Sequence, residues 1–466
     1  MPKAPESKDA CIIDRAPELV LSGCVATFRE WNVEQAWLFP PSVLDLVPEG
    51  HVAHFVRDTI RSLDLTEILK PYQTEDRGFP AYHPTMMTAL LLYAYCNGIF
   101  SSRRIARACE ERVDFMAVTG MQKPDFRTVS DFRKRHLPAL SGLFVQVLKL
   151  CQRAGMVQLG HVALDGTKIK ANASKRKAMS YGRMKEKEPE LAREVAQWMK
   201  AAESTDKAED KLHGREKRGD EMPQWIANKQ QRLEKIREAM AALEAEAKGS
   251  PDNDPPPKGG GSPPPEKSAP APSDKAQRNF TDPDSRILKT SDGFVQGYNC
   301  QLAVDAGEQV IVAHDTTNQQ NDGVRLPSML KAIKRNTGRQ AKELSADSNY
   351  CTLTNLAETQ LRRIRAYIAI GRQKHGAKAA VTGRLGTRKG NPIAVMRARL
   401  LRGGHRSRYR LRKQVVEPVI GQIKEALGFQ RFLLRRQSNV RHELGLVCTA
   451  HNLRKLARRA ARPAAA

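Results

Sequence analysis

The sequence HVALDGTKIKANASK, residues 161–175, contains the pattern from which the fold can be worked out. A short apolar strand from His161 to Leu164 is followed by Asp165, Gly166 and then a run with two lysines. A carboxylate at the C-terminal end of a buried strand lies at the rim of the sheet, where open α/β folds bind their ligands. Asp-Gly is also a common turn pair. Carboxylates at matching places further along the chain would favour a site over a turn.

The charge of the chain indicates a polyanionic partner. Its 466 residues, enough for about three domains, carry 78 Lys and Arg against 51 Asp and Glu, a formal net charge of +27. Such a charge favours nucleic acid or an anionic membrane surface. The longest apolar run, Met86 to Cys96, has about half the length that spans a bilayer. Asp14 and Arg15 interrupt the apolar stretch near the N-terminus, which disfavours a signal peptide. We therefore expect a nucleic-acid partner and no membrane.

The spacing of the cysteines indicates a reducing compartment. The eight of them include no CxxC pair, which fits neither a disulfide framework nor a zinc site. Reduced thiols of this kind are typical of the cytoplasm. We expect a cytoplasmic protein that binds nucleic acid.

The region before residue 157 divides into an irregular arm, residues 1–40, and an all-helical domain, residues 41–156. The run from Thr85 to Cys96 is apolar on every side and is expected to be a buried helix. The last segment, DFRTVSDFRKRHL from Asp125, predicts a basic helix. Its exposed face is expected to carry Arg127, Arg133, Lys134 and Arg135. A basic last helix is typical of a helix-turn-helix module that enters the major groove of DNA, but a solvated helix in a bundle fits the same residues.

The rest of the chain divides by composition. Residues 178–248, rich in charged residues and Ala with apolar residues at helical spacing, are expected to form an inserted helical hairpin. Residues 249–275, rich in Pro, Gly and Ser, are expected to be a disordered linker. The core domain is expected to comprise residues 157–177 and 276–455, followed by a basic tail, residues 456–466.

Strand patterns in the core domain predict a mixed α/β sheet. After the strand at 161–164, strands are expected at Gln296–Val304, Gln309–Ala313, Leu344–Ala346 and Ala366–Ile370, with a helix at Leu326–Ile333. Asp305, Ala306 and Gly307 join the first two of these later strands as a hairpin. In a sheet built in this order, the strand at 161–164 lies beside the strand at 344–346.

Two features follow the last strand. Arg372 to Lys413 contains many Lys and Arg and no Asp or Glu, and such a block needs a polyanion to neutralise it unless it is a solvated coil. Gln414 to Leu427 is then expected to be a helix with Pro418 in its first turn. This places Glu417 near the helix N-terminus and Lys424, seven residues on, along the same face.

Three carboxylates therefore come at matching places: Asp165 after the first strand, Asp347 after the strand at 344–346, and Glu417 in the helix. Two divalent ions about 3.5–4 Å apart can activate a nucleophile and stabilise the leaving oxygen in phosphodiester displacement. Mg²⁺ prefers oxygen ligands and keeps several waters, so a few carboxylates suffice. Because like charges so close repel each other, we expect the site to be coupled to bound Mg²⁺ or Mn²⁺, as two ions.

Seven motifs, taken as an ordered set, give a resemblance. They are SSRRIARAC, PDFRTVSDFRKRHL, VALDGTKIKANASK, DPDSRILK, GFVQGYNCQLAVD, LSADSNY and VEPVIGQIK. With them the chain resembles a DDE-type transposase of a bacterial insertion sequence, whose catalytic domain is RNase H-like and belongs to the retroviral integrase superfamily.

The resemblance implies that Asp165, Asp347 and Glu417 are the catalytic, metal-binding triad. It implies that water attacks the transposon end and frees a 3′-hydroxyl, which then attacks target DNA. The implied partners are double-stranded DNA, as terminal inverted repeats and as target, and further copies of the chain in a homo-oligomer on DNA. Lys424 matches the lysine seven residues after the family glutamate, and is implied to touch DNA near the cleaved end.

The sequence departs from a related signature, which places Arg four residues and Tyr seven residues before the glutamate. Those positions are Lys413 and Arg410 here, while Tyr409 and Arg412 each lie one residue earlier. We retain Tyr409, Arg412 and Lys413 as DNA-binding candidates. Asn349 stands where relatives often have Gly after the second aspartate, and Asn tolerates the left-handed conformation.

The supporting residues have two interpretations. Lys168 and Lys170, with Asn172, could hold phosphate, and a solvated edge strand explains them equally well. Asp284, Asn321 and Asp322 are expected to cap or orient rather than to bind metal. Two other functions also fit the chain: a non-catalytic DNA-binding repressor derived from a transposase, and an RNase H-like nuclease that cuts RNA–DNA hybrids without strand transfer.

Overall fold

The computed structural model describes residues 42–72, 81–213, 224–249, 271–290, 293–371, 391–403 and 408–461. The arm expected over residues 1–40 lies outside these ranges, as do most of the expected linker and part of the basic block at 372–413. The chain from Val43 to Ala466 forms one compact unit.

Helices alone precede the sheet in the described part of residues 42–156. They are α1 (Val52–Arg61), α2 (Thr66–Leu69), α3 (Pro84–Cys96), α4 (Ser102–Glu111), α5 (Val113–Thr119), α6 (Phe126–Arg135) and α7 (Leu137–Arg153). Every residue of α3 from Met87 to Cys96 is buried, as its uniformly apolar sequence predicted. Asp125 caps α6 by accepting the N–H of Arg127 at 2.7 Å.

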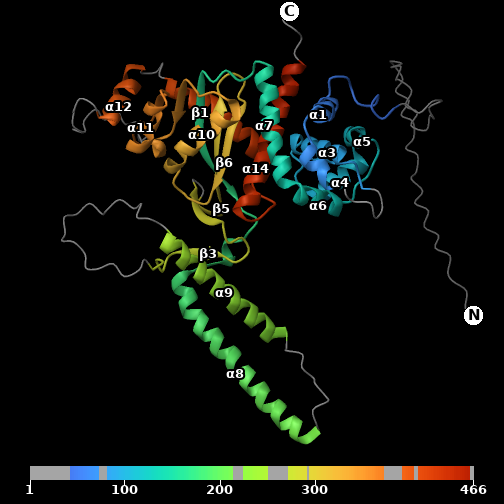
Figure 1. The fold of residues 1–466 in the computed structure, drawn as a ribbon, viewed down its shortest axis with the longest axis vertical. Coiled ribbons are helices and arrows are strands. Elements are labelled where there is room, and N and C mark those ends of the chain that lie inside the picture. The colour runs from blue at the N-terminus through green and yellow to red at the C-terminus, as the bar shows by residue number, and fades with distance from the viewer. Residues whose placement is uncertain are drawn as a thin grey trace, which may run out of the picture. The chain divides into compact units, whose positions relative to one another are not determined.

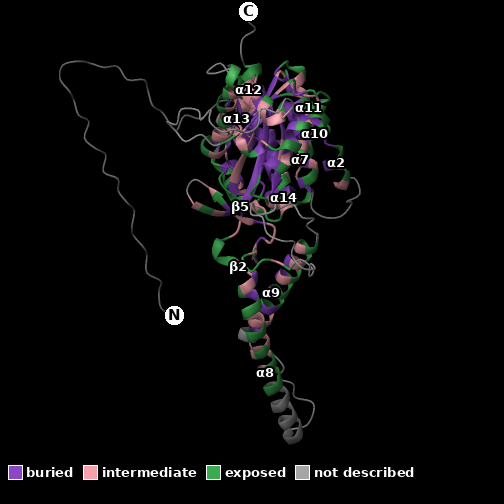
Figure 2. Cartoon of the chain, turned by 90° about the vertical axis from the view of Figure 1, so that its left-hand side faces the viewer, coloured by how far each residue is buried: buried purple, intermediate pink, exposed green. Residues whose placement is uncertain are grey.

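A long C-terminal helix, α14 (Gln437–Ala460), joins this helical region to the sheet. It packs against α7, α3 and strand β6 (Ile311–Thr317), and Figure 1 shows α7 and α14 standing between the sheet and helices α1 to α6. One contiguous set of buried apolar side chains runs from the helices into the sheet, seen as the purple interior in Figure 2. A domain boundary at residue 156 therefore stays a prediction.

The main sheet is mixed, as predicted. Its strands are β1 (His161–Lys170), β4 (Arg286–Thr290), β5 (Gly293–Asp305), β6, β7 (Glu343–Ala346) and β8 (Arg365–Ile368). The order is β4-β5-β1-β7-β8, with β6 also paired to β5. Strand β5 runs antiparallel to β1, β4 and β6, whereas β1, β7 and β8 are parallel. The expected neighbourhood of the strands that precede Asp165 and Asp347 is thus confirmed.

Some strands were not anticipated, and three helices complete this region. Strand β4 and a separate two-stranded sheet of β2 (Ala178–Ser180) and β3 (Gln277–Asn279) had no clear alternating pattern in the sequence. The helices are α10 (Leu326–Thr337), α11 (Leu353–Leu361) and α12 (Pro392–Gly403). Helix α12 lies inside the basic block, so the described part of that block is not a coil.

The first strand is longer than predicted. We expected it to end at Leu164, but β1 continues through Asp165 and Gly166 to Lys170. The reason is long-range pairing: β5 runs opposite this whole length, from Asp305 facing Val162 to Gly297 facing Lys170. The Asp-Gly pair therefore lies within a strand and not in a turn.

Helix α13 (Leu411–Gly421) begins earlier than predicted, so Pro418 lies inside it and Glu417 is not near its N-terminus. A proline has no N–H to give to the carbonyl four residues before it. That carbonyl, of Gln414, accepts instead from the Gln309 side chain at 2.9 Å, which lets the helix continue. A π-helical turn, η7 (Gln422–Ala426), follows. Because a π turn changes the angular phase, Lys424 need not share a face with Glu417.

The insertion is a pair of helices, α8 (Tyr181–His213) and α9 (Gln224–Gly249). They share an apolar cluster of Tyr181, Met184, Leu191, Leu233, Ile236, Ala239 and Leu243. Glu246 at the end of α9 pairs with Arg278 at 2.7 Å and Arg286 at 2.9 Å, which ties the hairpin to β3 and β4.

Membrane-spanning helices and the state of the cysteines can be described for the residues that the structure describes. Within these residues, no helix is long and apolar enough to cross a membrane. The cysteines there are free thiols: Cys96, Cys109, Cys151, Cys300, Cys351 and Cys448.

Candidate active site

Asp165 in β1 and Asp347, the residue directly after β7, lie at equivalent positions in the register of two neighbouring strands. In the parallel pair of β1 and β7, Ala163 lies opposite Ser345. Each aspartate comes two residues after this pair, and side chains two residues apart along a strand point to the same face. The register therefore brings the two carboxylates to the same edge of the sheet, where burial and, to a smaller extent, the charge of Asp347 raise the pKa of Asp165.

Arg412 connects the third carboxylate to this pair. Its guanidinium donates to Asp165 Oδ2 at 2.6 Å and to Glu417 Oε1 at 2.9 Å. The side chains of Asp165 and Arg412 are 14% and 15% exposed, whereas Glu417 is 42% exposed. Helix α13, which packs on β1, thus brings one cation and one carboxylate to the aspartates.

The site holds two partly buried aspartates in an environment that is unfavourable for negative charge. Burial raises the pKa of Asp165 to about 7, although Arg412 opposes the shift. Burial also raises the pKa of Asp347, opposed by the N–H of Asn349, which donates to Asp347 at 2.9 Å, and by the charges of Arg412 and Lys168. Additional positive charge at this place would therefore favour the ionised aspartates.

Arg412 and Tyr409, each one residue earlier than in the related signature, lie beside the carboxylates. Arg412 faces the carboxylates, whereas the neighbouring Lys413 is exposed. Tyr409 lies half-buried against Arg412, with which it forms a hydrogen bond, and burial raises the pKa of its hydroxyl. The shift by one residue therefore leaves an arginine and a tyrosine beside the carboxylates.

Comparison with protein families gives two matches. Residues 41–135 match the family model described as Transposase domain (DUF772), and residues 271–453 match the model described as Transposase DDE domain. The chain belongs to the DDE-type transposases. Searches of curated proteins and of solved structures found no match. Because Asp165 lies outside both matched regions, its place in the site rests on the sheet register and on Arg412.

The donor set of the transposase fits a hard divalent cation. Carboxylate oxygens are the ligands that Mg²⁺ and Mn²⁺ accept, and the site already accommodates one positive charge, the guanidinium between Asp165 and Glu417. Among the described residues, no three His, Cys, Asp or Glu side chains lie close enough to hold a metal ion together. A cation shared by all three carboxylates would therefore require these side chains to move closer together.

A buried polar network supports β1 and was not anticipated. Asp322 accepts from Asn299 Nδ2 and from Gln301 Nε2, each at 2.6 Å. Tyr350 donates its hydroxyl to Gln301. A Cβ on Gly166 would lie 2.6 Å from Asp322 Oδ1 and 2.7 Å from Gln301 Nε2. The charge of Asp322 also raises the pKa of Asp347, so this carboxylate acts on the site without joining it.

The other polar residues singled out in the sequence have structural contacts. Asp284 accepts the N–H of Gln437 at 2.9 Å at the start of α14. Asn321 accepts the N–H of Gly323 at 2.9 Å. Asn349 is not in the left-handed conformation that we considered for it. It belongs to a 3-10 turn that Asp347 caps, and its side chain donates to Asp322 at 3.3 Å.

The DNA-binding candidates of the transposase fall into three groups. Lys168 is half-buried near Asp347, and Lys170 is exposed at the end of β1. Lys424 is half-buried in the π turn η7. On α6, the exposed side chains are Arg127, Lys134 and Arg135.

Arg133 was wrongly expected on the exposed face of α6. It is 5% exposed and donates to the carbonyl of Phe100 at 2.8 Å and to Ser102 Oγ at 3.3 Å. Its position on the helix, next to the buried Phe132, turns it toward α4, where Phe100 lies in the preceding loop and Ser102 is the first residue of the helix. Arg133 therefore ties α6 to α4.

Proposed function

We propose that this transposase cuts the ends of its insertion sequence and joins them to target DNA, using Asp165, Asp347 and Glu417 as its catalytic, metal-binding triad. The described sheet, with β5 antiparallel and β7 and β8 parallel to β1, supports an RNase H-like catalytic domain. Cytoplasmic, nucleoid-associated action on DNA is part of the same proposal.

One observation carries the proposal. Arg412 of α13 pairs with both Asp165 on β1 and Glu417 on its own helix, and Asp347 directly follows β7, the strand beside β1. Burial raises the pKa of both Asp165 and Asp347, which is unfavourable for folding, and groups with perturbed pKa values occur preferentially at functional sites. Structural ion pairs alone would not require Asp347 beside Asp165.

Each residue has a role in this proposal. A bound divalent cation would polarise the scissile phosphate and lower the pKa of the attacking water. Asp165 and Asp347 would hold that cation with ionised oxygens, and Glu417, the most exposed of the three, would complete the set. Arg412 would keep the carboxylates together before the cation arrives. Tyr409, Lys168, Lys413 and Lys424 would contact DNA near the cleaved end.

The reaction comprises two phosphoryl transfers at the same site. In the first, the oxygen of water attacks phosphorus at the transposon end and the bond to the 3′ oxygen breaks, leaving a free 3′-hydroxyl. In the second, the oxygen of this hydroxyl attacks a phosphorus of the target strand, the new phosphodiester forms, and the bond from that phosphorus to the target's own 3′ oxygen breaks to leave a 3′-hydroxyl on the target. Helix α6, through Arg127, Lys134 and Arg135, is proposed to read DNA in a helix-turn-helix-like module, and a homo-oligomer is proposed to hold both ends.

The proposal is tested with Asp165→Asn. The variant is expected to bind DNA carrying the element's ends as well as the wild type does, and to cut it in neither Mg²⁺ nor Mn²⁺. Binding of the ends without any cutting by the wild type would favour the repressor. Cutting of RNA–DNA hybrids but not of transposon ends would favour the nuclease without strand transfer.

A further inference from the structure

A groove of about 710 Å³ lies at the C-terminal end of β1. Four parts of the chain line it: residues between Lys170 and Lys177, Thr281 in the loop before β4, the start of β5 at Phe294 to Gln296, and the segment with Arg431 and Arg435. The last segment is hydrogen-bonded to the end of β1, because Lys170 N donates to Gln430 and Phe432 N donates to Lys170. Two further contacts fix the walls: Lys175 Nζ donates to the carbonyl of Phe294 at 2.7 Å, and Arg435 Nε to that of Asn172 at 3.1 Å.

The groove has an uncompensated positive charge. Among the described residues that line it are five cations and no Asp or Glu; the cations are Lys170, Lys175, Lys177, Arg431 and Arg435. The side chains of Lys170, Lys177 and Arg431 make no hydrogen bond or ion pair within the described parts of the chain, and all three are exposed. Side chains held close together with like charge and no counter-ion repel each other until an anion binds.

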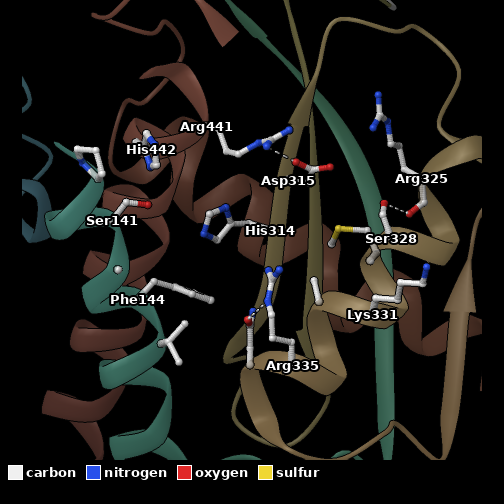
Figure 3. Close-up of a pocket in the computed structure, with 16 residues that line it drawn as sticks. Ser141, Phe144, His314, Asp315, Arg325, Ser328, Lys331, Arg335, Arg441 and His442 are labelled. Atoms are coloured by element: carbon white, nitrogen blue, oxygen red, sulfur yellow. Dashed lines mark hydrogen bonds and ion pairs between the residues drawn. The ribbon is translucent and has the colours of Figure 1, made fainter. Parts of the chain in front are cut away.

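A second basic cavity provides a contrast. It has about 610 Å³ and lies among α7, β6, α10 and α14 (Figure 3). There Arg441 is paired with Asp315 at 3.1 Å, and Arg325 donates to Thr317 at 2.6 Å. Since part of its charge is already satisfied within the protein, this cavity has less need of an external anion.

The position of the groove relative to Asp165 indicates that the anion is the phosphate backbone of DNA. Lys170 lies five residues after Asp165 on the same strand, a span of about 17 Å at 3.3–3.4 Å per residue. Successive phosphates of one strand of B-DNA advance about 3.4 Å along the axis, so the groove is about five base pairs from the carboxylates. A duplex cut at Asp165 and running along β1 would bring its backbone to these cations.

We propose that this groove binds the phosphate backbone of duplex DNA on one side of the cleavage site and so fixes the register of the cut. The inference rests on the proposed function, because the distance of the groove from Asp165 matters only if DNA is cut there. The test below measures DNA binding alone and does not need cleavage. Contacts to phosphate carry no sequence information, so the groove would hold any duplex.

The test measures how DNA binding depends on salt. Binding of a labelled synthetic duplex of arbitrary sequence is followed by fluorescence anisotropy in EDTA, between about 50 and 200 mM salt. The test variant carries Lys170→Gln, Lys177→Gln and Arg431→Gln. A control variant with the same loss of charge carries Lys331→Gln, Lys334→Gln and Arg335→Gln on α10. All six side chains are exposed, and thermal unfolding of each variant verifies its fold.

Each phosphate contact adds about 0.9 to the slope of log K against log salt. Loss of three contacts is therefore expected to reduce the slope by about 2.7 in the test variant, with little change in the control. An unchanged slope in the test variant, or an equal reduction in both, would overturn the proposal. Because EDTA removes divalent cations, the binding assay does not depend on cleavage. Its outcome is therefore independent of whether Asp165→Asn abolishes cutting.

Discussion

Arg412→Ala is expected to destabilise the protein by an amount that grows with pH. Arg412 is the cation between Asp165 and Glu417, and without it the pKa of Asp165 rises further above its value of about 7. A carboxyl whose pKa is raised on folding is protonated in the folded state over a range where the unfolded chain has lost the proton. Its contribution to stability therefore falls as pH rises through that range.

The magnitude follows from the pKa of Asp165. At pH 8, one unit above a pKa of about 7, ionisation lowers the folded-state free energy in the wild type by about 1.4 kcal/mol. The Arg412→Ala variant loses this stabilisation, because its Asp165 stays protonated at pH 8. The more exposed pair with Glu417 adds about 0.2–1 kcal/mol. We therefore expect a loss of about 2 kcal/mol at pH 8, and less than about 1 kcal/mol at pH 6, where Asp165 is protonated in both proteins.

Urea unfolding at the two pH values, without divalent cations, measures this difference. Arg408→Ala is the matched control, because Arg408 pairs with Glu343 at 2.9 Å but is 56% exposed; its loss is expected to be small at both pH values. Equal effects of Arg412→Ala at pH 6 and pH 8, or an effect no larger than that of the control, would refute the reasoning.

Two further substitutions test the contacts around the site and in α6. Gly166→Ala is expected to cost about 1–3 kcal/mol through overpacking, because a Cβ would lie 2.6 Å from Asp322 Oδ1; Gly142→Ala, with open space around it, is expected to be neutral or stabilising. Urea midpoints compare the two, and equal midpoints would count against a close approach of β1 to Asp322. Arg133→Met is expected to cost about 1–3 kcal/mol by leaving the carbonyl of Phe100 unpaired, whereas Lys134→Met is expected to stay within about 0.5 kcal/mol because Lys134 is exposed. Similar midpoints for these two variants would show that Arg133 is not a structural residue.

Local patterns predicted several elements well. The buried helix α3 follows from a run with no polar face, and the hairpin of β5 and β6 follows from strand patterns joined at Asp305. The pairing of β1 with β7 followed from the order of elements, because short connections and crossover helices leave few arrangements of such a sheet. Together they were enough to bring Asp165 and Asp347 to neighbouring strands.

Long-range contacts decided what local patterns could not. Asp165-Gly166 has the signal of a turn, but β5 pairs with this stretch and makes it a strand. Pro418 signals a helix start, but Gln309 satisfies the carbonyl that the proline leaves open. Arg133 lies in a basic sequence typical of an exposed helix face, but it is buried because the carbonyl of Phe100 and the hydroxyl of Ser102, both distant in the sequence, accept its hydrogen bonds. The network around Asp322 joins residues from three separate segments, and no spacing in the sequence predicts it.

Cleavage of DNA carrying the element's own ends tests the central claim most directly. The wild type is compared with Glu417→Gln and with Glu425→Gln, a matched control in the turn that follows α13, whose glutamate is exposed and bonded only to Gln430 among the described residues. We predict cutting that depends on Mg²⁺ or Mn²⁺ in the wild type and in Glu425→Gln, and none in Glu417→Gln, with DNA binding retained by all three. Cutting by Glu417→Gln at the wild-type rate would contradict the assignment of the third carboxylate.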